Sequence, residues 1–279
     1  MATDPEYVGA LLDICARERV GLLIPTIDDE LATLAVAAPR FLERGVKVAV
    51  SPADTAIACN DKYETARLLE ARGIATARTW LPSTLPAPVS LPLFIKPRVG
   101  RGGVGAFPVR SERELAFFLD YVSDPVLQPF LEGPEFTIDV LCDFEGTPLA
   151  IVPRERAVIR AGVVDRGRTV RDGRLMALGM ECARAIRAVG AINIQCRVVD
   201  GVPTVFEINP RFSGGIPLTI AAGADFPRLL VQLARGRRVP PQIGRFQDGL
   251  WMTSYETSVF IAEQAIGFSA TRAEIPEVA

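Results

Sequence analysis

Histidine is absent from all 279 residues of this sequence. Without an imidazole, Ser-His-Asp and Cys-His nucleophile systems, histidine-ligated zinc or haem, and imidazole general bases are excluded. Any chemistry must therefore rest on carboxylates, lysine, arginine, amides and metal ions held by oxygen. This set of groups favours phosphoryl or acyl-phosphate transfer.

Other features are sparse as well. The five cysteines are scattered and include no Cys-x-x-Cys pair, so we expect buried thiols in a reducing cytoplasm rather than disulfides or a zinc site. No apolar run approaches the roughly 18 residues that a membrane span needs, and the N-terminus lacks a signal pattern. The net charge of −2 gives no overall electrostatic attraction to nucleic acid or anionic lipid. We therefore expect a cytoplasmic protein with no nucleic-acid and no membrane partner.

Short apolar strands alternate with amphipathic helices along the chain, which predicts an α/β (α+β) fold that opens with parallel pairing. Asp4-Pro5 is placed to cap and begin the first helix, and Gly73 to end the third. Four prolines within 80–92 predict an irregular connection. Ser111 opens a capping-box pattern. The expected helices are 5–19, 28–41, 55–72, 111–122 and 174–189, and the expected strands include 20–25, 46–50, 93–96, 106–109 and 126–127.

The segment 205–215 is the strongest candidate for chemistry, because Glu207, Asn209 and Arg211 follow one another at a spacing of two in an apolar strand. Alternate side chains of a strand share a face, so these three project the same way, while Phe206 and Ile208 point oppositely into a core. Carboxylate and amide oxygens suit Mg²⁺, and a guanidinium suits phosphate. A merely solvated charged face is the alternative interpretation.

A hairpin over 191–209 would bring Gln195 toward Glu207. A two-residue loop at its Asp-Gly turn would place Gln195 opposite Phe206, on the wrong face. A three-residue loop, 199–201 with its glycine left-handed, would make Glu207 the diagonal neighbour of Gln195. A shared metal site therefore predicts the longer loop.

A glycine-rich stretch follows strand 93–96. It combines Lys96, Arg98 and Arg101 with four glycines between 100 and 105, whose N–H groups can approach phosphate closely. The spacing also fits Gly-x-Gly-x-x-Gly, but that dinucleotide motif requires a helix where a strand is expected here. A lid over nucleotide phosphates is the favoured interpretation. A flexible hairpin without a ligand is the alternative.

Gln128, at the end of a strand, precedes a short loop and Glu135. The amide, the backbone groups of the loop and the carboxylate could read an adenine edge and ribose hydroxyls. A polar loop without a ligand is the alternative.

Seven arginines lie within 154–174. A solvated arm would account for them. The functional hypothesis is an anion-binding flap, and it rests on Arg154 and Arg156, which follow an apolar strand and share one face.

Taken as an ordered set, these motifs resemble the ATP-grasp superfamily, most closely the branch related to the large subunit of carbamoyl-phosphate synthase. The resemblance runs from about residue 5 to residue 261. The motifs that carry it are Asn60-Asp61-Lys62, Phe94-Ile95-Lys96-Pro97, the glycine lid, Gln128-Pro129-Phe130, Glu135, Asn193-Ile194-Gln195 and Glu207-Ile208-Asn209-Pro210-Arg211.

The resemblance implies ATP and Mg²⁺ as cofactors and a role for each matched residue. Nucleotide contacts fall to Lys62, Lys96, Arg98, Gly102, Gly103, Val104, Gln128, Phe130, Leu131 and Glu135. The implied metal ligands are Gln195, Glu207 and Asn209, where Gln195 stands in place of the commoner acid. Arg211 is the implied catalytic arginine, with Arg154, Arg156, Ser213 and Gly214 toward the second substrate.

The implied activity is an ADP-forming ligase that makes a C–N bond. A substrate carboxylate would be phosphorylated by ATP, and an amine or similar nucleophile would then displace phosphate, with the protein supplying position and charge neutralisation. A small-molecule kinase on the same fold and a catalytically silent nucleotide-binding subunit are the alternatives.

The resemblance also implies a domain order. We expect a partial Rossmann-like pre-grasp subdomain over 1–53, a lid subdomain over 54–125, a large subdomain with the metal site over 126–262 and a weakly ordered tail over 263–279. Because the opening strands of the first subdomain are not found in the sequence, a homodimer or a partner that completes it is a further expectation.

Overall fold

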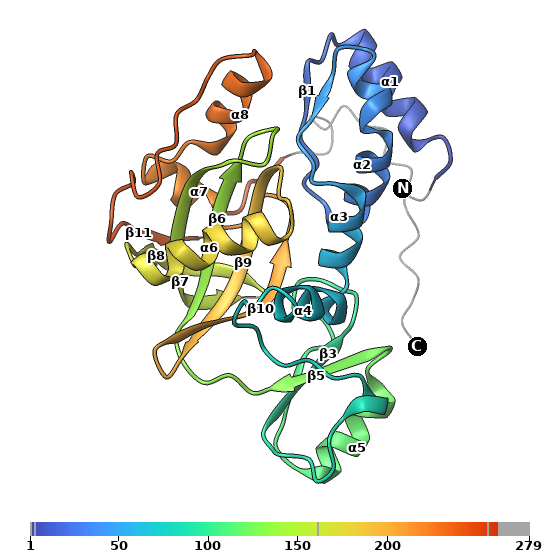
Figure 1. Cartoon of the computed structure of the whole chain (residues 1–279), viewed down its shortest axis with the longest axis vertical. Helices are drawn as coiled ribbons and strands as arrows, with labels where there is room; N and C mark the ends of the chain where they lie inside the picture. Colours follow the sequence, from blue (N-terminus) through green and yellow to red (C-terminus); the bar gives the residue numbers. More distant parts are fainter. Residues whose placement is uncertain (1, 3, 161, 256, 262–279) are drawn as a thin grey trace.

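The structure is a computed structural model that describes residues 2, 4–160, 162–255 and 257–261; the expected tail over 263–279 lies outside the described residues. Its strands form three sheets of two, three and six strands, which Figure 1 shows as an N-terminal part, a large central part and a small part holding α5. No helix among the described residues is long and apolar enough to cross a bilayer.

The N-terminal part packs two helices on a minimal parallel sheet. Helix α1 (Tyr7–Arg17) and helix α2 (Asp28–Leu42) confirm the helices expected over 5–19 and 28–41, although α1 begins after Glu6 rather than at Pro5. Strand β1 (Leu22–Leu23) pairs in parallel with β2 (Lys47–Val48). Both strands are shorter than the expected 20–25 and 46–50. Leu12, Leu31 and Phe41 are fully buried in this core.

The prediction of a single helix over 55–72 was wrong, because the helix is interrupted at Asp61. Helix α3 (Ala53–Asn60) ends there, and α4 (Lys62–Glu70) begins one residue later. The Asp61 carboxylate accepts hydrogen bonds from the backbone N–H groups of Tyr63 and Glu64, at 2.9 and 3.1 Å, which makes it an N-cap. The break places Lys62 at the start of α4, where its backbone N–H donates to the Arg98 carbonyl at 3.0 Å.

The small sheet has the order β4–β3–β5, all antiparallel, with β3 (Leu93–Pro97) in the centre between β4 (Phe107–Val109) and β5 (Pro125–Pro129). Helix α5 (Glu112–Tyr121) covers it, and the Ser111 hydroxyl accepts from the N–H of Glu114 at 3.2 Å, as the capping pattern predicts. The proline-rich connection holds only the 3₁₀ turn η1 (Pro82–Thr84). Ile95 of β3 points into the core of this part.

The large sheet has the order β10–β9–β6–β7–β8–β11 and is antiparallel throughout. Its strands are β6 (Glu135–Cys142), β7 (Pro148–Arg160), β8 (Val163–Thr169), β9 (Gly190–Val199), β10 (Val202–Asn209) and β11 (Trp251–Thr253). Helix α6 (Gly173–Ala185) packs across one face, where a Cβ at Gly179 would meet Ile138 at 2.9 Å. Helices α7 (Ile216–Ala221) and α8 (Phe226–Ala234) follow the last long strand.

The turn expected between β9 and β10 was wrong. Val199 pairs with Val202, so the loop has the two residues Asp200 and Gly201, both with positive φ (48° and 80°). Positive φ at both central positions is the conformation of the two-residue hairpin turn that Asp-Gly favours. The turn by itself would place Gln195 opposite Phe206.

A β-bulge in β10 corrects that register. Val205 pairs with Cys196, the register then shifts, and Glu207 pairs directly with Gln195. A bulge sets two residues against one, so side chains beyond it change face. Val205 and Ile208 both point into the core, whereas Phe206 lines a cavity beside Glu207. The expectation that Phe206 points into the core was therefore wrong. Gln195 and Glu207 do come together, through the bulge rather than through a three-residue loop.

The two-residue turn is tested by replacing Gly201 with alanine. A Cβ there meets only the tip of Arg174 at 3.9 Å, so the loss of stability comes from the left-handed backbone and amounts to about 1 kcal/mol. The matched control is Gly173→Ala at the start of α6, where a Cβ meets nothing within 4 Å and the helix gains slightly. Urea unfolding of both variants measures the difference, and equal stabilities would contradict the turn.

Candidate functional site

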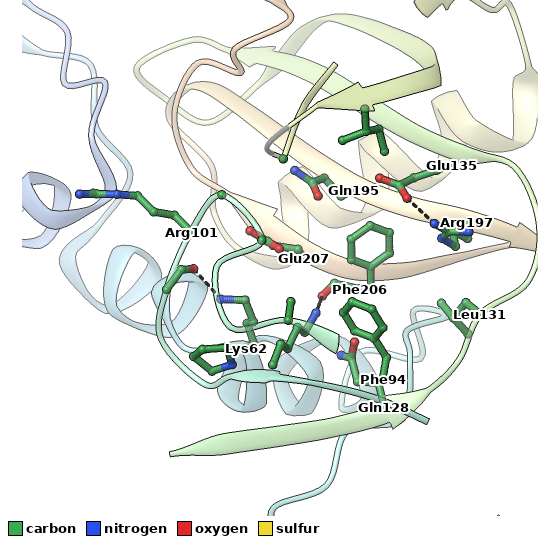
Figure 2. Close-up of a pocket in the computed structure, with 18 of the residues that line it drawn as sticks. Lys62, Phe94, Arg101, Gln128, Leu131, Glu135, Gln195, Arg197, Phe206 and Glu207 are labelled. Carbon is green, nitrogen blue, oxygen red and sulfur yellow. Dashed lines mark hydrogen bonds and ion pairs between the residues drawn. The ribbon is translucent and has the colours of Figure 1, made fainter. Parts of the chain in front are cut away.

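A cavity of about 340 Å³ lies between the small and the large sheet. Its walls come from the start of α4, from β3 and β5, from the loop between β3 and β4, and from the facing strands β6, β7, β9 and β10 (Figure 2). The predicted site residues that it brings together are Lys62, Lys96, Gly102, Gly103, Val104, Gln128, Phe130, Leu131, Glu135, Arg156, Gln195 and Glu207.

Two lysines supply the positive charge of the cavity. Lys96 is 5% exposed, and its ammonium donates to the Phe206 carbonyl at 3.2 Å; Lys62 donates to the Gly100 carbonyl at 2.7 Å. Burial lowers the pKa of Lys96, the nearby carboxylate of Glu207 opposes that shift, and the Lys62 charge adds to it, which leaves a pKa of about 8. An anion entering the cavity would raise the pKa of Lys96 again.

Gln195 and Glu207 form a pair of oxygen donors on the large sheet. They are direct partners in the β9–β10 ladder, and Thr137 of β6 flanks Gln195 on the other side. Both side chains face into the cavity, with Lys62 on the opposite wall (Figure 2). Asn209 does not line the cavity; its amide donates to Glu207 at 3.3 Å and so orients that carboxylate.

This donor set fits a hard divalent cation only if other ligands complete the coordination shell. Among the described residues there is no cluster of three or more His, Cys, Asp or Glu side chains that could hold a metal alone. One carboxylate and one amide oxygen at adjacent ladder positions match the way Mg²⁺ is bound, through one or two protein oxygens plus water and phosphate oxygens.

Glu135 is held between two arginines at the far end of the cavity. Its carboxylate pairs with Arg156 at 2.9 Å and with Arg197 at 2.6 Å. Burial lowers the pKa of Arg156, and Glu135 opposes that shift. The two ion pairs fix the orientation of the carboxylate, which is the condition for a positioned hydrogen-bond acceptor.

Apolar side chains line the same end. Phe94 from the small sheet and Phe206 from the large sheet both line the cavity, together with Gln128 and Ile159 of β7 (Figure 2). Gln128 is 3% exposed. Two rings with one buried amide at their edge form a slot suited to a flat heterocycle that carries polar atoms on its rim.

The glycine loop closes the cavity. Its tip touches the β7–β8 hairpin so closely that a Cβ at Gly162 would lie 2.7 Å from the Gly102 backbone. Arg101 of the loop also reaches Asp29 at the start of α2, at 2.8 Å. The loop thus contacts both the large sheet and the N-terminal part, as a lid would.

The structure places six predicted site residues outside the lining of the cavity: Arg98, Arg154, Asn209, Arg211, Ser213 and Gly214. Arg98 pairs with the capping carboxylate of Asp61 at 2.7 Å. Arg154 is 1% exposed and binds Asp139 through two nitrogens, at 2.7 and 3.1 Å. Ser213, expected toward a second substrate, accepts from Arg154 at 2.8 Å, so both belong to a buried network on the large sheet.

Arg211 is engaged by the N-terminal part. It donates to both carboxylate oxygens of Asp28, at 2.8 and 2.7 Å, and to the Phe212 carbonyl at 2.9 Å. A two-nitrogen fork on a carboxylate is the strongest geometry that arginine offers to such a group. The carboxylate of Asp28, the first residue of α2, therefore already binds Arg211, the arginine for which the sequence predicts anion binding.

The arginines of 154–174 lie on the β7–β8 hairpin and around the start of α6, and those from Arg160 onward are exposed. Arg168 pairs with Glu155 at 2.6 Å and lies over the Trp251 ring. Arg174 pairs with Asp172 at 2.8 Å. Of the two arginines proposed for an anion-binding flap, only Arg156 reaches the cavity.

Several lining residues escaped the sequence analysis. Phe94 had a signal, since it alternates with buried Ile95 and so shares a strand face with Lys96. Arg197 had the same kind of signal, because it lies two residues beyond Gln195 in β9. Phe206 had none, because its place depends on the bulge.

Family models match two parts of the chain. A family model described as "ATP-grasp in the biosynthetic pathway with Ter operon" matches residues 122–258, which hold every strand of the large sheet. The chain therefore carries an ATP-grasp domain. A second model, "PylC-like, N-terminal domain", matches residues 1–49 ahead of it. The prediction of an ATP-grasp fold behind a pre-grasp subdomain is confirmed.

Relatives of the ATP-grasp domain include the large chain of carbamoyl phosphate synthase from Thermoanaerobacter sp. (strain X514), 28% identical over 178 residues. That match covers 58% of this chain but only 16% of the relative. The biotin carboxylase domain of Hydrogenobacter thermophilus 2-oxoglutarate carboxylase, solved with MgADP and bicarbonate, superposes with a TM-score of 0.71 at 17% identity, covering 88% of this chain and 60% of that one. D-alanine–D-alanine ligase from Bacillus anthracis, solved with ATP, gives 0.62 at 17% identity, covering 83% and 84%.

The lowered pKa of Lys96 makes stability depend on pH in a set direction. Its folded value of about 8 lies below its ordinary 10.5, so between these values the unfolded chain holds the proton and the folded chain releases it. We expect the free energy of unfolding of the wild type, relative to Lys96→Met, to rise by on the order of 2 kcal/mol from pH 7 to pH 10. Urea unfolding of both proteins across that range measures it. A difference that stays flat would contradict the burial of the ammonium.

Proposed function

We propose that this protein is an ATP- and Mg²⁺-dependent ligase that activates a carboxylate as an acyl phosphate and joins it to an amine or similar nucleophile. The observation that carries the proposal is one lid-covered cavity in which two lysines face a Gln–Glu oxygen pair, with an aromatic slot at its far end. The relatives and fold neighbours named above, which include carbamoyl phosphate synthase and D-alanine–D-alanine ligase, support this class of chemistry.

In this proposal each wall of the cavity has one task. The slot between Phe94 and Phe206 takes the adenine, Glu135 accepts from ribose hydroxyls, and Lys62 and Lys96 hold the phosphates with the N–H groups of the glycine loop. Gln195 and Glu207 would hold Mg²⁺, which would supply charge neutralisation at the phosphates. The lid excludes water, which would otherwise hydrolyse a reactive acyl phosphate.

Arg211 is the candidate for binding the substrate carboxylate and its phosphorylated form. Its support is that the guanidinium already binds a carboxylate, that of Asp28, through two nitrogens. Arg211 is also hydrogen-bonded to Asn209, whose amide in turn orients Glu207. The carboxylate end of the reaction would thus stand next to the proposed metal, where the γ-phosphoryl group must be transferred.

The three hypotheses are separated by incubating the full chain with ATP, Mg²⁺ and a panel of amino acids and small carboxylic acids, while ADP and free phosphate are measured. Substrate-dependent release of both in equal amounts supports the ligase. Release of ADP without free phosphate supports a small-molecule kinase. Tight ATP binding without turnover across the panel supports a silent nucleotide-binding subunit and contradicts the ligase.

The metal role of Glu207 gives a sharp mutational prediction. Glu207→Ala should lower Mg²⁺-dependent ATP turnover by at least about 100-fold, because it removes the sole carboxylate of the proposed donor pair. Glu43→Ala, at an exposed carboxylate beyond the end of α2, is the matched control and should keep full turnover. The folded content of both is checked by circular dichroism. Normal turnover in Glu207→Ala would show that the metal is held elsewhere.

A further inference from the structure

A hydrogen-bond chain of fixed direction lies behind the aromatic slot. The Thr79 hydroxyl donates to the carbonyl of Ala77 at 2.8 Å, and the Gln128 amide nitrogen donates to the Thr79 oxygen at 2.9 Å. The carbonyl of Ala77 can only accept, and a hydroxyl has one hydrogen to give. Once that hydrogen is given to Ala77, Thr79 can take a bond from Gln128 but cannot donate one to it.

This chain decides which end of the Gln128 amide is free. Its nitrogen is committed to Thr79, so its oxygen is the atom left for a ligand in the cavity that Gln128 lines. Figure 2 shows that oxygen turned toward the rings of Phe94 and Phe206. With the opposite orientation, the NH₂ group would face the slot and the Thr79 oxygen would meet the amide oxygen with no proton between them.

Thr79 itself is held firmly in place. Its segment pairs with the large sheet at one end, where the N–H of Ala77 donates to the Val205 carbonyl at 2.7 Å. At its other end Trp80 exchanges two backbone hydrogen bonds of 2.9 Å with Leu127, the neighbour of Gln128. The side chain of Thr79 is therefore positioned against Gln128 by both sheets, although it is not among the residues that line the cavity.

We propose that Thr79 is a positioning residue that sets the base selectivity of the nucleotide site. The proposal rests on the ATP-binding function proposed above. The amide oxygen that Thr79 leaves free accepts from the 6-amino group of adenine and meets a 6-oxo group, as in hypoxanthine or guanine, as acceptor against acceptor. Since an unpaired buried polar group is expensive, the wrong base is rejected even though the aromatic slot accepts both rings.

The test compares the dissociation constants of MgATP and MgITP by isothermal titration calorimetry on the full chain. Inosine triphosphate differs from ATP only at the 6-position and the adjoining N1, so the phosphate and ribose contacts cancel in the ratio. The wild type should favour ATP by about 10- to 100-fold. Thr79→Val keeps the shape of the side chain and removes the hydroxyl, so the Gln128 amide is free to rotate by about 180°. The ratio of ATP to ITP affinity should then fall by about tenfold, chiefly through tighter ITP binding. Thr79→Ser, which keeps the hydroxyl, should retain the wild-type ratio.

A second comparison removes any dependence on how well Thr79→Val folds. Gln128→Glu presents acceptor oxygens in every orientation, so within that background the Thr79→Val change should leave the ATP-to-ITP ratio unmoved. A wild-type ratio in Thr79→Val with unchanged melting temperature, or an equal drop in both backgrounds, would overturn the role of Thr79 and leave the proposed function standing. Failure of the wild type to bind MgATP would overturn the proposed function itself.

Discussion

The candidate site depends on a single extra residue in strand β10. The bulge at Phe206 sets Glu207 beside Gln195, turns an aromatic ring into the cavity, and presents the Phe206 carbonyl to the ammonium of Lys96 at 3.2 Å. Without it, the two-residue turn would put Gln195 opposite Phe206, and the proposed oxygen pair would fall out of register. One register shift therefore fixes the proposed oxygen pair, one wall of the aromatic slot and the position of one of the two lysines together.

The same strand is where the two sheets meet. Lys96 belongs to the small sheet and bonds to β10 of the large one, and the segment before Trp80 pairs with Val205 immediately ahead of the bulge. The lid closes the opposite side through Gly102 and Gly162. A ligand in this cavity touches both sheets at once, so its binding energy can stabilise their relative position, which is how binding is coupled to closure in enzymes with lids.

The N-terminal part reaches the site through two ion pairs. Asp28 and Asp29 are consecutive residues at the start of α2, and they pair with Arg211 and with Arg101 of the lid, respectively. The Arg211 pair is largely shielded from solvent, whereas the Arg101 pair is exposed and is worth little by itself. Of these two ion pairs, the one with Arg211 is the better shielded, and it adds to the apolar core that Leu22, Ile24 and Ala49 share with the large sheet.

The local sequence pattern predicted much of this candidate site, whereas the remaining features depend on contacts between residues far apart in the sequence. The periodicity of β3, the glycines of the lid and the oxygen-bearing residues of β10 were readable because each signal lies within a few residues of sequence. The bulge was not, since its benefit is the fit of Val205 and Ile208 into a core shared with distant α6. The break at Asp61 was missed because the apolar period continues across it, while the capping carboxylate that ends it is also paired with Arg98, 37 residues away. Arg154 looked like an anion-binding residue, and only the fold reveals Asp139 as its buried partner.

The most direct test of the account is a crystal structure of the full chain with Mg²⁺ and a non-hydrolysable ATP analogue. The account predicts the base between Phe94 and Phe206, the phosphates on Lys62 and Lys96 beneath the glycine loop, and a metal ion touching both Gln195 and Glu207. A nucleotide bound outside this cavity, or a metal ion that contacts neither of the paired side chains, would contradict it.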